Sequence, residues 1–101
     1  MSEDKIRQLN FIEQSLQSVF MQRQQFQAQL VEIDSALIEL AKTNSAYRII
    51  GNIMVASNKE DLKKDLEEKK EVFSARLKVL EKQEAKFRED AQMLQKEIMK
   101  K

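Results

Sequence analysis

The 101-residue chain has no cysteine, no proline, no tryptophan and a single glycine. The lack of cysteine excludes a disulfide framework and fits a reducing cytoplasm, and the lack of proline leaves long helices uninterrupted. No apolar run approaches the ~20 residues that a membrane span needs, and the first ten residues are too polar for a signal peptide. These absences predict one folding unit with a cytoplasmic location.

The chain also has no histidine and no glycine-rich phosphate loop, so the usual general bases, metal ligands and phosphate cradles are missing. The carboxylates Glu67, Glu68 and Glu71 stand in a mixed-charge run that is typical of a solvated helix face. We therefore expect no enzyme, no metal and no cofactor. The 18 basic and 17 acidic residues nearly cancel and alternate along the chain, which gives no attraction to nucleic acid or to a membrane.

Apolar residues recur every seven positions in both halves of the chain, in two rows per half. The rows are Leu9, Leu16, Leu30 and Leu37 with Ile12, Val19, Phe26, Ile33 and Leu40, and then Leu66, Phe73, Leu80, Phe87 and Leu94 with Leu77, Ala91 and Ile98. Rows offset by three or four residues form the 3.5-residue repeat of a coiled-coil seam. Polar residues interrupt the seam at Arg23, Lys70 and Glu84. Such long side chains either extend out of the seam toward water or set its register.

The helical period fails between residues 44 and 58, where strand-forming residues surround the only glycine. Gly51 is free to adopt a positive φ, and Asn52 beside it tolerates one next best. This segment therefore predicts a β-hairpin that turns around residues 50–52. Ser57 with Glu60 and Asn58 with Asp61 both have capping-box spacing, which predicts that a second helix begins here.

The predicted fold is mainly α: two long helices over residues 4–43 and 59–100 form an antiparallel coiled-coil hairpin, joined by a single β-hairpin over 44–58. Each helix of about 40 residues would measure ~60 Å. The hairpin would expose apolar side chains and unpaired strand edges, which invite further strand pairing. We expect hairpins of several copies or relatives to join into a sheet or barrel; the alternative is a loose cap folded onto the helix ends. The residues of this oligomerisation hairpin are Tyr47, Ile49, Ile50, Gly51, Asn52, Ile53 and Val55.

This arrangement resembles the prefoldin family, and specifically its β-class subunits, which carry one hairpin. The resemblance lies in Tyr47, in the turn from Gly51 to Val55, in Asp61-Leu62, and in the region of Gln83-Glu84. Many family members have Gly-Pro at the turn where this chain has Gly51-Asn52, a difference that the fold tolerates.

The resemblance implies an ATP-independent chaperone subunit in a heterohexamer of two α-type and four β-type subunits. The hairpins would form a double β-barrel, and the ends of the coiled coils would hold non-native client proteins for delivery to a group II chaperonin. In this chain those ends are the two termini. The expected client-binding residues are Ile6, Leu9, Phe11, Ile12, Met93, Leu94, Ile98 and Met99. Exposed methionine is common on promiscuous surfaces, although single apolar residues on a helix surface are also ordinary.

A second reading remains open at this point. The chain would then be a structural or tethering coiled coil that dimerises through its seam, with the hairpin as a clasp. A tether predicts a dimer or one unrelated partner, whereas a prefoldin-like chaperone predicts a hexamer with a related subunit.

Overall fold

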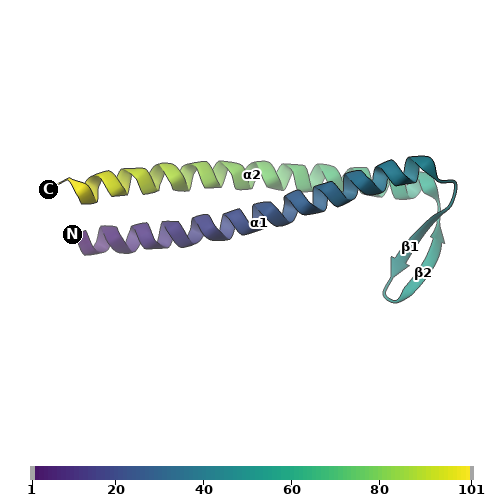
Figure 1. The fold of residues 1–101 in the computed structure, drawn as a ribbon, viewed down its shortest axis with the longest axis horizontal. Helices are drawn as coiled ribbons and strands as arrows, with labels where there is room; N and C mark the ends of the chain where they lie inside the picture. Colours follow the sequence, from purple (N-terminus) through teal and green to yellow (C-terminus); the bar gives the residue numbers. More distant parts are fainter. Residues whose placement is uncertain (1, 101) are drawn as a thin grey trace. The chain divides into compact units, whose positions relative to one another are not determined.

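The structure, a computed structural model, describes residues 2–100. Along the chain lie helix α1 (Ser2–Lys42), strand β1 (Ala46–Ile50), strand β2 (Ile53–Ser57) and helix α2 (Lys59–Met99), as Figure 1 shows. This order confirms the predicted fold class, two long helices with one β-hairpin between them. The bounds of both helices lie within two residues of the predicted ones.

The heptad rows mark the buried side of both helices. Every apolar residue of the four rows is buried or half-buried, and the most buried side chains are Val19, Ile33, Leu40, Leu80 and Ala91. Even these remain 6–8% exposed, because a two-helix seam has no second layer to cover it. Neither helix, over the described residues, has a stretch long and apolar enough to cross a membrane.

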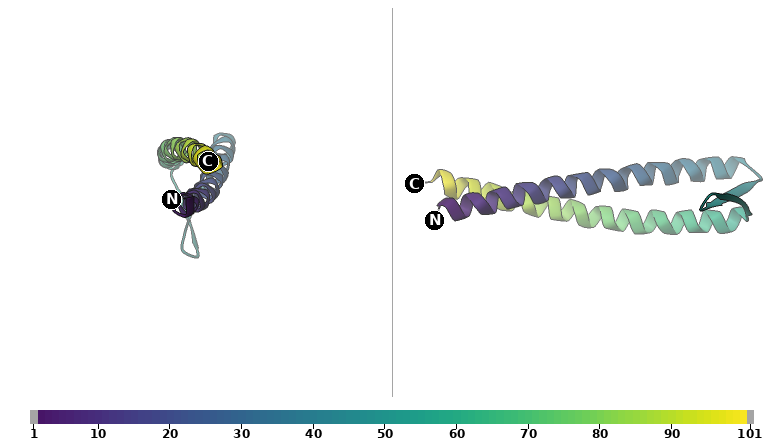
Figure 2. Two further views of the ribbon diagram at one scale, coloured as in Figure 1. Left: turned by 90° about the vertical axis from the view of Figure 1, so that its left-hand side faces the viewer. Right: turned by 90° about the horizontal axis from the view of Figure 1, so that it is seen from below.

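The chain forms two compact units, and the first consists of residues 2–26 with residues 76–100. In this unit the beginning of α1 and the end of α2 lie together and run in opposite directions, as Figure 1 and the right-hand view of Figure 2 show. An ion pair of 3.5 Å between Lys5 Nζ and Glu97 Oε2 joins the two helices close to their ends. The first unit therefore brings the two terminal segments of the chain side by side.

The second unit, residues 27–75, holds the rest of both helices and the hairpin. Lys70 Nζ lies 2.8 Å from Asp34 Oδ1, so the predicted seam lysine reaches sideways to an acidic residue of the other helix. Tyr47 of β1 shares a shallow groove with Leu40, Leu62 and Leu66. The base of the hairpin thus lies beside both helices of its own unit.

The hairpin has a two-residue loop. Antiparallel pairing runs from Ala46 opposite Ser57 to Ile50 opposite Ile53, which leaves Gly51 and Asn52 as the loop. Gly51 has φ of 60° and is the only described residue with a positive φ. A positive φ at the first loop residue alone is the pattern of a type II′ turn, whose twist matches that of the strands.

Asn58 begins the second helix. Its Oδ1 accepts a hydrogen bond of 2.8 Å from the backbone N–H of Glu60 and a longer one of 3.4 Å from that of Asp61. The backbone carbonyl of Asn58 accepts the first helical bond, from Leu62 N–H, at 3.0 Å. Of the two predicted caps, Asn58 is therefore the N-cap, and Ser57 belongs to β2.

Candidate functional site

Exposed apolar side chains gather at the terminal end of the first unit, which we call the helix ends (residues 2–12 of α1 and 90–99 of α2). Ile6, Phe11, Met93 and Met99 are all exposed here, with Phe11 at 67% and Met93 at 56%. None of these four residues belongs to the apolar rows of the seam. The helix ends therefore present apolar surface to solvent.

Two shallow grooves arrange part of this surface. One has a volume of about 390 Å³ and joins the two helices; its lining residues are Gln8, Ile12, Asp90, Met93, Leu94 and Glu97. The other lies on α1 alone and is lined by Arg7, Gln8, Phe11 and Ile12. The structure thus brings four of the predicted client-binding residues together around Ile12. Ile6 and Met99 line neither groove.

The remaining predicted residues, Leu9 and Ile98, lie in the seam and are half-buried. Ile12 and Leu94 share this intermediate burial while also lining a groove. These seam residues are therefore only partly accessible while the helices stay paired.

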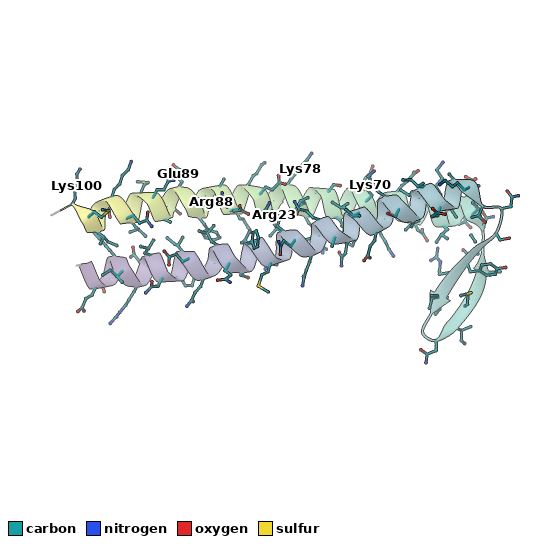
Figure 3. The ribbon with its side chains drawn as sticks, viewed as in Figure 1. Arg23, Lys70, Lys78, Arg88, Glu89 and Lys100 are labelled. Carbon is teal, nitrogen blue, oxygen red and sulfur yellow. The ribbon has the colours of Figure 1, made fainter. Side chains whose placement is uncertain are left out.

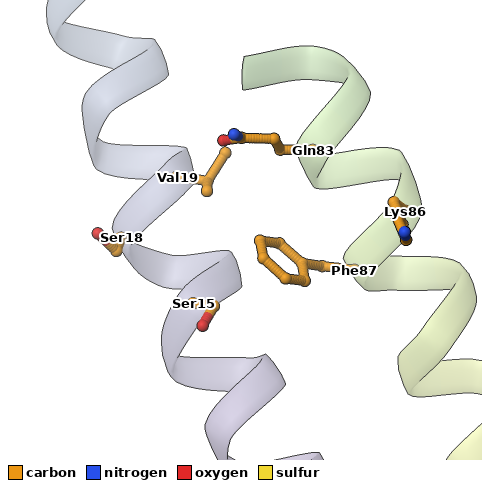
Figure 4. Close-up of a pocket in the computed structure, with 6 residues that line it drawn as sticks. All are labelled: Ser15, Ser18, Val19, Gln83, Lys86 and Phe87. Carbon is orange, nitrogen blue, oxygen red and sulfur yellow. The ribbon is translucent and has the colours of Figure 1, made fainter. Parts of the chain in front are cut away.

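A third groove in the first unit was not predicted from the sequence. It has a volume of about 320 Å³, and it is lined by Ser15, Ser18, Val19, Gln83, Lys86 and Phe87. Figure 4 shows the Phe87 ring pointing from α2 toward α1, between Val19 and Ser15. Because the two serine side chains are short, they leave one edge of this aromatic ring uncovered.

Two of the predicted seam interruptions meet each other. Arg23 Nε lies 3.0 Å from Glu84 Oε2, and the two side chains are only 24% and 12% exposed. Arg88 Nη2 lies 2.8 Å from the second oxygen of Glu84, and the Arg23 guanidinium lies 5.3 Å from the centre of the Phe20 ring. Figure 3 labels Arg23 and Arg88 on the two helices. Glu84 is therefore held between two arginines, one from each helix.

The sequence contained a signal for this contact. Leu40 is the last seam residue of the first helix, and Leu66 is the first apolar seam residue of the second. If these two are placed opposite each other in an antiparallel pair, the seam positions that follow toward the termini place Arg23 opposite Glu84. Periodicity within each helix does not reveal this pairing, because it appears only when the two ladders are aligned with each other.

The hairpin presents apolar side chains on both of its faces. Ile50, Ile53 and Val55 share one face with Arg48, whereas Tyr47, Ile49 and Met54 lie on the other. All six apolar side chains are exposed. A two-stranded ribbon with two apolar faces and two free edges is typical of a strand pair that is covered in an assembly.

No cluster of three or more acidic side chains within residues 2–100 has the geometry to hold a metal ion. The three grooves of the first unit are open and shallow, and each is lined by a mixture of apolar, amide and charged side chains. This arrangement provides surfaces for protein contact.

The comparisons with known proteins agree with this geometry. The family model described as prefoldin subunit matches residues 3–101. The chain is 42% identical to the prefoldin subunit beta of Archaeoglobus fulgidus, over 86% of this chain and 78% of that one. It is 33% identical to the prefoldin subunit beta of Pyrobaculum islandicum, over 97% of this chain and 81% of that one.

A solved structure gives the same result for the fold. The crystal structure of the prefoldin beta subunit from Thermococcus strain KS-1 superimposes with a TM-score of 0.88. The two chains are 32% identical, and the match covers 96% of this chain and 88% of the other. The chain therefore belongs to the prefoldin subunit family, alongside its beta subunits.

Proposed function

We propose that this chain is a β-type subunit of an ATP-independent chaperone, and that it holds non-native proteins at its helix ends. Membership of the prefoldin family implies a chaperone role. The observation that supports this location is a pair of grooves that share Ile12 at an exposed apolar end. One is lined by Phe11 on α1 alone, and the other joins the two helices and is lined by Met93. Shallow contacts of this kind suit clients without a fixed shape, and several copies in one complex would add avidity.

The assembly that we propose consists of four copies of this chain with two α-type subunits, joined through their hairpins, in the cytoplasm. The two apolar faces of the hairpin and its free edges support this role. Delivery of the client to a group II chaperonin completes the proposal. We propose neither catalysis nor a cofactor, and neither nucleic acid nor membrane as a partner.

A pair of matched variants tests the client site. Phe11→Ser with Met93→Ser removes two side chains that are 67% and 56% exposed at the helix ends. Val31→Ser with Ile38→Ser removes two that are 65% and 58% exposed elsewhere on α1. We expect the first variant to lose most of its suppression of the aggregation of a denatured enzyme, while the second retains it. Equal loss in both variants, with folding intact, would place the client surface elsewhere.

The assembly has its own test, native mass spectrometry of the complex purified from its source cells. Four copies with two of a larger, similarly built subunit would support the chaperone assembly. A bare dimer would contradict it and would favour the tethering coiled coil instead.

A further inference from the structure

The heptad pattern by itself leaves the register of the two helices ambiguous. Similar apolar residues recur every seven positions along both, so a relative slip by one heptad again sets an apolar row against an apolar row. Such a slip moves one helix by ~10.5 Å along the other. Something besides the apolar rows is needed to distinguish these registers in the first unit.

Arg23 and Glu84 provide that distinction. In the observed register the two side chains meet at 3.0 Å. After a slip of one heptad in either direction, Arg23 would stand opposite Leu77 or Ala91, and Glu84 would stand opposite a leucine. Glu84 would keep Arg88 of its own helix in any register, whereas Arg23 would lose its only carboxylate. A charge that loses its partner while shielded from water is costly, so the observed register is favoured over both slipped ones.

The pair is sheltered enough for this cost to matter. Arg23 Nε and Glu84 Oε2 are both removed from solvent, and among the described residues neither atom has a hydrogen-bond partner of good geometry. Their close approach is therefore an ionic contact, and each atom is compensated mainly by the other. Phe20 beneath the Arg23 guanidinium and Arg88 on the second Glu84 oxygen hold both groups in place.

We propose that Arg23 and Glu84 are positioning residues that select the register of α1 against α2 in the first unit. A buried polar contact that fixes register at some cost in stability is a known device of coiled coils. The register decides which side chains share a groove: Ile12 with Leu94, and Val19 with Phe87. The consequence for client binding rests on the proposed function, whereas the register itself does not.

The absence of native cysteine allows a direct measurement of register in the full chain. Val19→Cys with Gln83→Cys reports the observed register, because both residues line the groove of Figure 4 and their side chains point toward each other. Val19→Cys with Arg76→Cys, or with Asp90→Cys, reports a slip of one heptad in each direction. A disulfide requires Cα atoms roughly 4.4–6.8 Å apart, so one pair cannot report both registers.

Each cysteine pair is combined with three backgrounds: the unchanged chain, Arg23→Leu with Glu84→Leu, and the charge reversal Arg23→Glu, Glu84→Arg and Arg88→Glu. The double leucine variant is chosen because replacing both members of a sheltered ion pair by apolar residues preserves folding. Replacing only one member would leave the other charge buried without a partner. The charge reversal keeps the pair and its second arginine contact with the signs exchanged.

The unchanged chain and the charge reversal should both give the native disulfide. In the double leucine variant the ratio of slipped to native disulfide should rise by about tenfold or more, the factor that corresponds to ~1.4 kcal/mol. The proposal is overturned if the double leucine variant keeps the same ratio of slipped to native disulfide as the unchanged chain. It is also overturned if the charge reversal raises this ratio as much as the double leucine variant does. Failure of the unchanged chain to suppress aggregation would count only against the proposed function, since the disulfide readout needs no client.

Discussion

Arg48 in β1 and Asp65 in α2 form an ion pair that ties the hairpin to the second helix. The contact joins Nη2 of Arg48 to Oδ2 of Asp65, and the two side chains are 41% and 44% exposed. It spans seventeen residues of sequence, so it is a contact between elements and not a local turn. Because both groups are partly solvated, its effect is on the placement of the hairpin more than on the stability of the chain.

This contact gives the first prediction. Arg48→Ala and Asp65→Ala, alone and together, should show a coupling free energy of about 0.2–1 kcal/mol in a double-mutant cycle, the range of partly exposed pairs. Helix content by circular dichroism should not change. Amide exchange in β1 and β2 should become faster in all three variants, because the hairpin loses a tether. A coupling of several kcal/mol would contradict this account.

The turn gives a second prediction, at Gly51. A Cβ at this position would meet no atom within 4 Å, so any cost arises from its φ of 60° and not from crowding. Gly51→Ala should destabilise the hairpin by about 1–3 kcal/mol, the cost of a side chain in a sparsely populated backbone conformation. Asn52→Ala is the matched control, since Asn52 has no positive φ, and it should have a much smaller effect. Amide exchange of the strand pairs Ile50–Ile53 and Ile49–Met54 measures both.

The apolar hairpin gives a third prediction. Ile53→Asp with Val55→Asp should prevent assembly and leave helix content unchanged, because it sets two charges on one face of the ribbon. The control is Val31→Asp with Val72→Asp, which places charges at helix positions that are 65% and 48% exposed, against 67% and 42% in the hairpin. Size-exclusion chromatography with light scattering reads out the oligomer. An intact oligomer in the hairpin variant would refute the assembly role.

Much of the fold was predictable because it depends on periodicity. A seven-residue repeat determines which side of each helix is buried, and a glycine among β-branched residues identifies the reversal. These are local properties of the sequence, and the structure confirms the mainly α fold with one hairpin between two long helices. The same periodicity marked Arg23 and Glu84 as interruptions, although it did not show that they meet.

The grooves were not predictable in the same way. The groove over Phe87 exists because Ser15 and Ser18 are short on the helix opposite, which is a relation between two helices and not a pattern within one. The residue that caps the second helix could not be chosen from the sequence either. Ser57 and Asn58 both had capping-box spacing, and the strand pairing of Ser57 with Ala46 decided between them.

That decision gives the last prediction, at the start of α2. Asn58→Ala removes the acceptor of the Glu60 N–H bond and should lower the free energy of unfolding by about 1 kcal/mol, within the range of about 0.5–2 for a lost N-cap. Asn58→Asp should retain most of the stability, because a carboxylate accepts the same bond and favours the helix N-terminus. Ser57→Ala should have only a small effect, since its place in β2 depends on backbone pairing. Urea denaturation of the three variants measures the differences, and an equal loss in Ser57→Ala would move the cap to Ser57.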